Sequence, residues 1–388
     1  MVSSGRELPR RASVVIIGGG IMGVSTAYYL AAAGVTEVVL VDADAFGSGS
    51  TSKAAGGVRA QFSDPINIKL ALRSLRTFET FGEQFGQEID FHQVGYLFLL
   101  DSPGDVSAFT RAVQVQNELG VPSRMISVAE AARLSPLIST DELIAAVFCP
   151  TDGYCTPESV VLGYATAARR HGARLIPHCR VTRIETDGGQ ITTVVTDAGP
   201  VSTGTVICAA GPWSRQVGEW AGVDLPVTPL RRQVLVTEPV SGIDPHTPFT
   251  IDFGTSFYFH REGPGLLMGM SDPDETPGFK LNRSDAWLPG LGRAMQRRAP
   301  ALMGTGIRSG WAGLYEVTPD HNALIGESAT AGRFLYATGF SGHGFLMGPA
   351  VGEVLRDLYL GRPPCVDVGE LSADRFAASM PRPERSII

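Results

Sequence analysis

The sequence predicts an α/β protein of two domains, one of which is assembled from separate stretches of the chain. Its 388 residues exceed the size at which a single hydrophobic core stops growing, so two domains are expected. The chain begins as strand, glycine-rich turn, helix and strand, with the strands at residues 13–17 and 37–41. Residues 227–270 contain alternating runs separated by Pro and Gly, a pattern typical of antiparallel strands. Residues 333–360 return to a strand, a glycine-rich turn and a helix, which indicates that both ends share one domain.

These changes in pattern set the expected domain limits. We expect the first domain to comprise residues 1–90, 150–222 and 318–388. The second, a mixed domain with a mainly antiparallel sheet, is expected at residues 91–149 and 223–317. The other expected elements are helices ending near residue 33 and at 66–85, 106–119, 157–171 and 285–298, with strands at 95–100, 174–176, 181–186, 191–195, 205–208, 232–237 and 256–260.

Composition and charge exclude several classes of protein. A net charge of −7 argues against nucleic acid as a partner, because a phosphate-binding surface needs a concentrated excess of Lys and Arg. The 5 cysteines form no CxxC pair, which suits neither a disulfide framework nor a zinc site and fits a reducing cytoplasm. No apolar run approaches the roughly 20 residues that a membrane-spanning helix needs, and no signal peptide is recognisable. We therefore expect a cytoplasmic protein with no membrane span and no metal site.

The glycine pattern after the first strand predicts a dinucleotide-binding turn. Residues 14–23 read Val-Val-Ile-Ile-Gly-Gly-Gly-Ile-Met-Gly and contain Gly18-x-Gly20-x-x-Gly23 between a strand and a helix. In a Rossmann-type unit, such glycines allow a tight turn, a close approach to a pyrophosphate and close helix packing. Asp42 ends the second strand about twenty residues further on, where a carboxylate accepts hydrogen bonds from a ribose. The pattern is shared by NAD and FAD sites, so it does not identify the dinucleotide.

Three further segments rich in small residues favour FAD. They lie at residues 46–59, 205–214 and 337–352, where small side chains let the backbone approach a planar ligand closely. The third segment opens the last helix, whose positive end can stabilise negative charge on a reduced cofactor ring. An NAD-linked dehydrogenase would share the first turn but leave this C-terminal turn without a function.

Together these segments resemble a known enzyme superfamily. The order GGGIMG, GSGSTS, CAAGPWS and GFSGHGF is similar to that of the D-amino-acid oxidase/glycine oxidase/sarcosine oxidase superfamily of FAD enzymes. The resemblance is strongest to the beta subunits of sarcosine oxidase and of heteromeric L-proline dehydrogenase. It extends over nearly the whole chain and includes residues 57–62, 95–100, 150–153, 311–315 and 318–320. It implies a Rossmann-type, glutathione-reductase-like or D-amino-acid-oxidase-like FAD domain with an inserted substrate domain.

The resemblance assigns the cofactor contacts to the glycine-rich segments and their neighbours. We expect FAD to contact Gly18, Gly20, Ile21, Met22, Gly23, Asp42, Ala43, Gly49, Ser50, Thr51, Ser52, Gly57, Val58, Val181, Ala210, Gly211, Trp213, Gly339, Gly342, His343, Gly344, Phe345, Leu346 and Met347. Some relatives attach the flavin through a cysteine at the position of Gly313, so non-covalent FAD is expected here.

The resemblance also implies five catalytic residues. Arg59 matches a basic residue beside the flavin, and His343 matches a histidine next to the flavin ring. Tyr315 matches a tyrosine facing the substrate, and Tyr258 matches one that contacts the substrate carboxylate. His260 lies two residues after Tyr258 and is therefore expected on the same face of its strand.

The sequence departs from the pattern of this family at two positions, which concern the reaction with oxygen and the binding of the substrate carboxylate. The lysine that helps monomeric sarcosine oxidase to react with oxygen is replaced by Leu267. The lysine that binds the substrate carboxylate is replaced by Leu346, so another cation must take its place. Arg59, Arg261 and Lys53 are the three alternatives that the sequence leaves open.

The expected function is oxidation of the C–N bond of a small secondary amino acid such as sarcosine, iminodiacetate or proline. The imine formed would hydrolyse, and O₂ is the expected electron acceptor, giving H₂O₂. The first alternative is a dehydrogenase subunit that passes electrons to a partner subunit or a quinone. The second is a flavin-binding structural subunit that no amine reduces. A homo-oligomer is equally compatible with the sequence.

Overall fold

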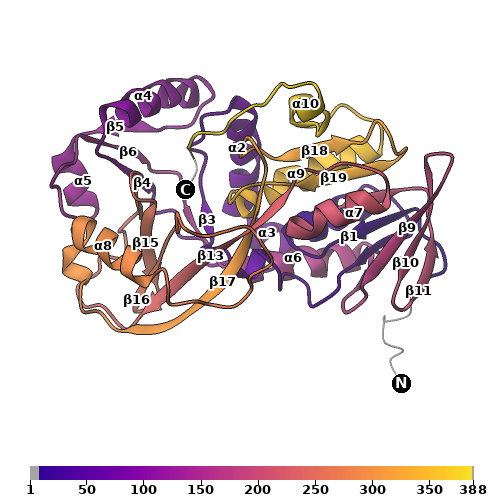
Figure 1. Cartoon of the computed structure of the whole chain (residues 1–388), viewed down its shortest axis with the longest axis horizontal. Helices are drawn as coiled ribbons and strands as arrows, with labels where there is room; N and C mark the ends of the chain where they lie inside the picture. Colours follow the sequence, from indigo (N-terminus) through magenta and orange to yellow (C-terminus); the bar gives the residue numbers. More distant parts are fainter. Residues whose placement is uncertain (1–7, 387–388) are drawn as a thin grey trace.

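The chain folds around two large sheets that lie side by side (Figure 1). The structure is a computed structural model in which residues 8–386 are described. Among these residues, no helix is both long and apolar enough to cross a membrane.

The first sheet has six strands in the order β18-β19-β12-β1-β2-β8. In chain order they are β1 (Val14–Ile17), β2 (Val38–Val41), β8 (Arg174–Ile176), β12 (Val206–Cys208), β18 (Leu324–Glu327) and β19 (Phe334–Thr338). All neighbouring strands are parallel except β18 and β19. The residues of β1 and β2 are all buried, as the strands of a sheet covered on both faces must be.

Helices cover one face of this sheet, and a three-stranded sheet together with one helix covers the other. The helices are α1 (Ile21–Ala32), α2 (Pro65–Glu79), α3 (Phe81–Phe85), α6 (Pro157–Arg170) and α9 (Gly344–Tyr359), and α1 packs between α6 and α9. The opposite face packs against β9 (Val181–Asp187), β10 (Gln190–Thr196), β11 (Gly199–Ser202) and α7 (Ser214–Trp220). Alternate residues of β1 therefore enter two different hydrophobic cores.

The helix expected at residues 66–85 is interrupted. The backbone at Thr80 has φ −116° and ψ 15°, outside the helical region, so α2 ends at Glu79 and α3 starts at Phe81. The Thr80 hydroxyl donates to the Arg76 carbonyl at 3.0 Å, which offers the chain a local alternative to the helical bond.

The second sheet has eight strands in the order β17-β13-β16-β15-β14-β4-β6-β5. In chain order they are β4 (Tyr96–Leu100), β5 (Arg124–Ile126), β6 (Ala145–Cys149), β13 (Thr228–Thr237), β14 (Phe249–Asp252), β15 (Phe257–Glu262), β16 (Gly265–Met270) and β17 (Ile307–Val317). All of its pairings are antiparallel except β14 with β4. Strand β17 was not predicted, because glycines at 310 and 313 weaken the strand pattern.

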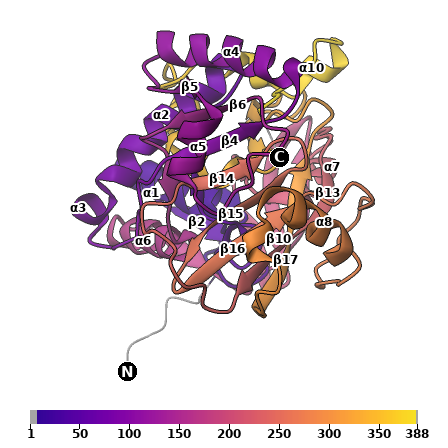
Figure 2. The same ribbon diagram turned by 90° about the vertical axis from the view of Figure 1, so that its left-hand side faces the viewer.

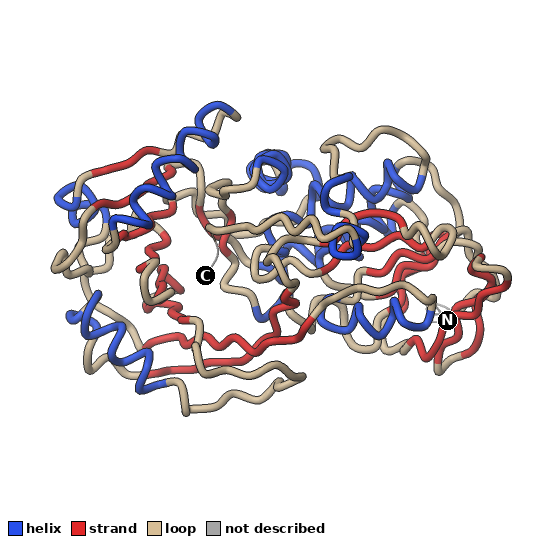
Figure 3. Tube along the Cα trace, turned by 45° about the horizontal axis from the view of Figure 1, so that its top comes forward, coloured by secondary structure: helices blue, strands red, loops and turns tan. Residues whose placement is uncertain are grey.

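Helices flank the second sheet on its outer side. They are α4 (Pro103–Glu118), α5 (Val128–Leu134) and α8 (Leu288–Arg298), and α4 lies above β5 and β6 in both views of the ribbon (Figures 1 and 2). Figure 3 shows the strands of this sheet as a red layer in the left half, with the blue helices at its outer edge. The short helix α10 (Asp374–Ala377) belongs to the other half of the molecule.

The two sheets confirm the predicted fold class, a mixed α/β fold with a Rossmann-type sheet and a separate, mainly antiparallel sheet. Every strand of each sheet falls within the residue ranges expected for the corresponding domain, while the exact limits stay a prediction. A two-stranded ladder of β3 (Gly57–Val58) and β7 (Gly153–Tyr154) adds a further pairing between distant parts of the chain.

Candidate functional site

A cavity of about 530 Å³ lies between the two sheets. Its wall includes the residues at and just beyond the carboxyl ends of β1, β2, β12 and β19, where parallel sheets bind their ligands. The opposite wall is one face of the second sheet, and the loop at residues 48–57 joins the two. The cavity thus spans both halves of the fold.

The turn after β1 requires its glycines. Gly18 has φ +108°, and a Cβ there would lie 2.3 Å from the Ala209 carbonyl oxygen at the end of β12. A Cβ at Gly23 would lie 1.8 Å from the Gly18 carbonyl oxygen, so this residue lets α1 pack on the turn. A Cβ at Gly20 would meet only the Thr51 hydroxyl, at 3.1 Å, which leaves its backbone open to the cavity. This open backbone fits a phosphate-bearing ligand.

Asp42 fixes the other side of the turn. Its carboxylate accepts from the Gly19 amide at 2.6 Å and from the Asp44 amide at 2.7 Å. Burial raises the pKa of Asp42, against the lowering effect of these two backbone bonds. The side chain lines the cavity at the end of β2, as expected for a ribose contact.

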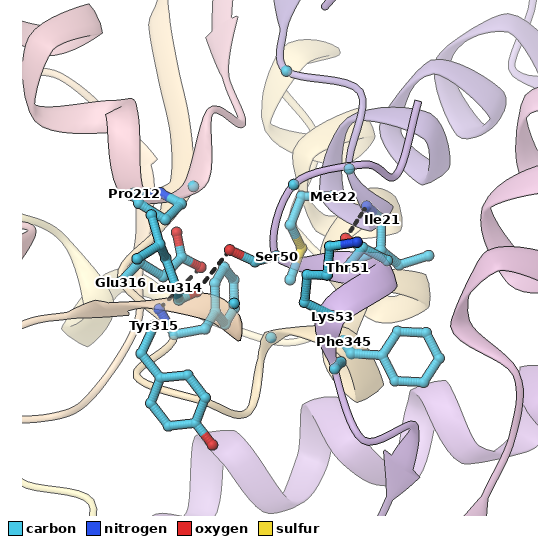
Figure 4. Close-up of a pocket in the computed structure, with 18 of the residues that line it drawn as sticks. Ile21, Met22, Ser50, Thr51, Lys53, Pro212, Leu314, Tyr315, Glu316 and Phe345 are labelled. Carbon is cyan, nitrogen blue, oxygen red and sulfur yellow. Dashed lines mark hydrogen bonds between the residues drawn. The ribbon is translucent and has the colours of Figure 1, made fainter. Parts of the chain in front are cut away.

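The small-residue loop ties the two walls together. The Thr51 hydroxyl accepts from the Ile21 amide at 3.1 Å, and the Ser50 hydroxyl donates to the Leu314 carbonyl at 2.7 Å (Figure 4). The Lys53 carbonyl accepts from the Trp311 indole at 3.1 Å. The stretch at 46–59 is therefore bonded to α1 on one side and to β17 on the other, and is no flexible linker.

The face of the second sheet brings three tyrosines to the cavity, namely Tyr96 of β4, Tyr258 and Tyr315. Tyr258 of β15 is the cross-strand partner of Gly269 in β16. A Cβ at Gly269 would lie 2.4 Å from the Tyr258 hydroxyl oxygen. Tyr315 of β17 packs on Gly342, where a Cβ would lie 2.4 Å from its ring. Burial raises the pKa of Tyr258 and of Tyr315, so both hydroxyls stay protonated at neutral pH.

Arg59 and His343 face the cavity from the first domain. The Arg59 guanidinium donates to the carbonyls of Gln61 and Ser386, the second at 2.6 Å, and lies 4.0 Å from the Phe62 ring centre. His343 is 3% exposed, and neither of its ring nitrogens has a hydrogen-bond partner among the described residues. Burial lowers its pKa to about 3, so the imidazole is neutral. Buried nitrogens without partners fit a ligand contact.

Arg232 and Glu316 are among the cavity residues that were missed from the sequence. Arg232 of β13 lies over the Tyr315 ring, 5.0 Å from its centre. Residues two apart in a strand share a face, and Val234 also lines the cavity. The strand spacing of Arg232 and Val234 was therefore the signal that could have placed Arg232 in the cavity wall. Glu316 accepts from the Thr338 hydroxyl at 3.0 Å, and burial raises its pKa to about 7. No pattern marks Glu316 beyond its place after Tyr315.

Most of the predicted contacts reach the cavity. The predicted cofactor residues that line it are Gly18, Gly20, Ile21, Met22, Asp42, Ala43, Gly49, Ser50, Thr51, Gly57, Val181, Ala210, Gly211, Trp213, Gly342, His343, Gly344, Phe345 and Leu346. The predicted catalytic residues that line it are Arg59, Tyr258, Tyr315 and His343. Their roles stay predictions.

Five predicted cofactor residues lie behind the wall. Val58 and Met347 belong to the hydrophobic core, and Gly23 packs against the Gly18 carbonyl. A Cβ at Gly339 would lie 2.4 Å from the Thr318 methyl group, and the Ser52 amide is bonded to the Gly47 carbonyl. These residues shape the wall and do not face the cavity.

His260 is also placed behind the wall. It shares the strand face of Tyr258, because both rings stack on Phe249, at 5.5 and 4.8 Å between ring centres. Its Nε2 lies 3.0 Å from the Ala55 carbonyl and its Nδ1 lies 2.8 Å from the Arg261 carbonyl. Burial lowers the pKa of His260 to about 4, so the neutral ring has one N–H and donates to one of these two carbonyls. This geometry gives no support to a catalytic role for His260.

The cavity has no features of a metal centre. Across residues 8–386, no group of three or more His, Cys, Asp or Glu side chains is placed to hold a metal ion. Its donors are backbone amides, hydroxyls, the guanidinium groups of Arg59, Arg180 and Arg232, the Lys53 ammonium and one imidazole, a set that fits an organic cofactor and an anionic substrate.

Comparison with known proteins gives the family. Residues 13–358 match the family model DAO, described as FAD dependent oxidoreductase. The chain is 31% identical to dimethylglycine dehydrogenase of Rattus norvegicus over 394 residues, which cover 95% of this chain and 45% of that protein. It is 30% identical to sarcosine dehydrogenase of Homo sapiens, covering 97% of this chain and 42% of that protein. The chain therefore spans less than half the length of these curated relatives.

A solved structure matches over the full length. L-proline dehydrogenase from P. horikoshii superposes with a TM-score of 0.91 at 33% identity, covering 97% of this chain and 100% of that chain. The family model, the relatives and the fold agree with the glycine turn and the cavity described above. The chain belongs to the DAO family of FAD-dependent oxidoreductases, a family whose cofactor is FAD and whose chemistry is the oxidation of amines and amino acids.

Proposed function

We propose that this chain uses non-covalently bound FAD to oxidise the C–N bond of a small N-substituted amino acid. The observation that carries the proposal is the composition of one cavity. A glycine turn that accepts a dinucleotide lies in one wall, and Arg232 lies with Tyr258 and Tyr315 in the other. The names of the relatives, which act on dimethylglycine, sarcosine and L-proline, support this substrate class.

The residues of the first domain would hold the cofactor. The open backbone at Gly20 and the N-terminus of α1 suit the pyrophosphate, and Asp42 suits the ribose. Gly313 has no side chain that could form a covalent link, and a Cβ there would lie 2.6 Å from the Lys53 Cβ. When bound, FAD supplies the two-electron acceptor for the oxidation.

Arg232 is the cation placed to receive the substrate carboxylate. Its Nε is buried and has no hydrogen-bond partner, and no carboxylate within residues 8–386 forms an ion pair with it. The neighbouring Arg231, on the other face of β13, is instead paired with Glu275 at 2.6 Å. A guanidinium with a free donor binds a carboxylate through charge-assisted hydrogen bonds.

The three cations suggested by the sequence fit this role less well. The Arg59 guanidinium already donates to two carbonyls, and Arg261 is outside the cavity wall and donates to the Gly263 carbonyl. Lys53 lines the cavity but its side chain is exposed to solvent. Arg232 therefore replaces them as the proposed carboxylate partner.

The site favours the amine in its neutral form. The protonated phenols of Tyr258 and Tyr315, the neutral imidazole of His343 and the side chain of Leu346 all line the cavity. Burial in such surroundings disfavours an ammonium group, so the substrate nitrogen would lose its proton to water on binding. The reaction then needs no dedicated base, and its product, an imine, would hydrolyse in solution.

An anaerobic absorbance titration tests the proposal. Purified protein would be mixed with sarcosine, N,N-dimethylglycine, proline and iminodiacetate, each paired with a matched amine that lacks the carboxylate. We expect bleaching of a flavin spectrum by one of the acids and no bleaching by its matched amine. A colourless protein that FAD does not reconstitute, or bound flavin that no amine reduces, would refute the function.

The electron acceptor separates two forms of this function. O₂ is the acceptor in an oxidase, whereas a dehydrogenase passes electrons to a partner. Leu267, which replaces the oxygen-activating lysine of monomeric sarcosine oxidase, is 3% exposed and absent from the cavity wall, which favours the dehydrogenase as second candidate. Air admitted after the titration decides: rapid recovery of the spectrum with peroxide identifies an oxidase, and a spectrum that stays bleached identifies a dehydrogenase.

A further inference from the structure

The last described residues of the chain run back to Arg59, a residue of the cavity wall. After α10, residues 380–386, here named the C-terminal segment, pass over α2 toward the middle of the molecule (Figure 1). Glu384 and Ser386 in this segment are 3% exposed. Polar residues buried to this extent are held by specific contacts.

Glu384 anchors the segment to the loop that follows Arg59. Its carboxylate accepts from the Ser63 amide at 2.9 Å, the Ser63 hydroxyl at 2.5 Å, the Asp64 amide at 3.1 Å and the Asn67 side chain at 2.9 Å. These bonds lower the pKa of Glu384 although burial acts in the opposite direction. The group is therefore an ionised carboxylate held by four donors of the loop and helix α2.

A second set of contacts fixes the start of the segment. Arg382 forms an ion pair with Asp64, and its amide donates to the Asp320 carboxylate at 2.8 Å. Asp320 is itself paired with Arg375 at 2.8 Å. The Thr318-Pro-Asp320 turn, a motif in the sequence with no assigned contact, thus holds the C-terminal segment in place.

Ser386, the last residue of the C-terminal segment, contacts Arg59. The Ser386 carbonyl accepts from Nη2 of Arg59 at 2.6 Å, and the Gln61 carbonyl accepts from Nη1. Among the described residues no carboxylate forms an ion pair with this guanidinium, so two carbonyls are its hydrogen-bond acceptors. Burial lowers the pKa of Arg59, against the raising effect of nearby carboxylates that include Glu384 and Asp152. Loss of one carbonyl acceptor would leave a buried donor unsatisfied and destabilise the guanidinium in its present position.

We propose that the C-terminal segment is a positioning element of the site, which holds the Arg59 guanidinium at the cavity through the Ser386 carbonyl, with Glu384 as its anchor. The proposal rests on the proposed function in one respect, namely that a flavin occupies the cavity that Arg59 lines. Release of the segment would let Arg59 move away from the wall and weaken its stabilisation of the anionic reduced cofactor.

The test measures the midpoint potential of the bound flavin by photoreduction against a reference dye, which requires no amine substrate. We expect Glu384→Gln to shift the equilibrium toward oxidised flavin about tenfold, which corresponds to about 30 mV for a two-electron couple. Glu370→Gln is the matched control, because Glu370 also contacts Arg382 but is exposed and makes no contact with the loop after Arg59. Its potential should equal that of the unchanged protein.

A double-mutant cycle shows whether Glu384 acts through Arg59. In an Arg59→Lys background the guanidinium contact to Ser386 is already lost. Glu384→Gln should therefore shift the equilibrium between oxidised and reduced flavin by less than twofold. An equal tenfold shift in both backgrounds would overturn the proposal, since Glu384 would then act on the flavin without Arg59. An unchanged potential in Glu384→Gln alone would overturn it as well.

A chain ended after Ser379 provides a second variant. It removes the C-terminal segment but keeps the Arg375–Asp320 pair, and we expect the same shift as for Glu384→Gln, with FAD still bound. Bound FAD with an unchanged potential in this variant would contradict the proposal. Failure of the proposed function is seen separately, as flavin that no amine reduces in the unchanged protein.

Discussion

The two walls of the cavity differ in the groups that they present. The wall from the first sheet presents the backbone of a turn that depends on glycines whose Cβ atoms would clash within 1.8–2.3 Å. The wall from the second sheet presents side chains, among them Arg232, Tyr258 and Tyr315, which strand register brings together from β13, β15 and β17. The backbone wall is therefore sensitive to any added atom, whereas the side-chain wall changes specificity one group at a time.

The largest effect is expected in the backbone wall. Gly18→Ala places a Cβ 2.3 Å from the Ala209 carbonyl oxygen at φ +108°, so the turn must move away from the cofactor. We expect FAD affinity to fall at least about a hundredfold, or by about 2.7 kcal/mol, measured by quenching of flavin fluorescence.

Gly34→Ala is a control for Gly18→Ala, because it introduces a Cβ at a positive φ without a steric clash. Gly34 has φ +88° but nothing within 4 Å of its Cβ position, so this variant carries only the cost of a left-handed alanine, about 1–2 kcal/mol of stability. Its FAD affinity should match that of the unchanged protein. Equal losses of affinity in both variants would mean that the turn after β1 does not contact the cofactor.

The side-chain wall is tested by Arg232→Met, which keeps the length of the side chain and removes its charge. We expect kcat/KM for the amino-acid substrate to fall about a hundredfold while FAD affinity stays within about twofold, because a charge-assisted carboxylate contact contributes about 1.5–3 kcal/mol. Arg232→Lys should recover part of the loss, since it keeps the charge but not the planar fork. An unchanged kcat/KM in the methionine variant would remove Arg232 from the substrate site.

The same contrast explains how much could be predicted from the sequence. The turn at residues 18–23 and the place of Asp42 after the second strand were predictable, because close backbone approaches demand glycine at fixed spacing. Arg232 was not, since its role depends on Gly313 facing it across the β13–β17 ladder and on Tyr315 beside it. His260 was chosen correctly for its strand face, but the Ala55 carbonyl that engages its ring comes from a loop about two hundred residues away, as the register of the strand cannot show.

Glu316 lies where the two walls meet, and it predicts a pH dependence of stability. Its pKa is raised to about 7 in the folded chain from 4.5, so between these values the unfolded chain binds fewer protons than the folded one. The free energy of unfolding of the FAD-free protein should therefore fall as pH rises from 4.5 to 7. We expect Glu316→Gln to reduce this fall by about 1–2 kcal/mol in urea unfolding at pH 5 and pH 8, less than the full shift because the carboxyl faces the cavity.

Asp152 is a second buried carboxyl group that contributes to the pH dependence of the free energy of unfolding. Burial raises its pKa to about 6, so it contributes in the same direction and part of the pH dependence should remain in the variant. An identical slope with and without the Glu316 carboxyl would show that this group ionises alike in the folded and unfolded chain.

The smallest effect is expected at Lys53, the cavity cation whose side chain reaches solvent. A solvated ammonium gains little from pairing with a carboxylate, about 0–1 kcal/mol, whereas Arg232 offers a buried donor without a partner. Lys53→Met should therefore leave KM for the amino acid within about threefold at low salt, measured by steady-state kinetics, and should leave FAD binding unchanged. If its effect instead equalled that of Arg232→Met, the carboxylate would be bound at the loop between the two walls, and the division between a backbone wall for the cofactor and a side-chain wall for the substrate would be wrong.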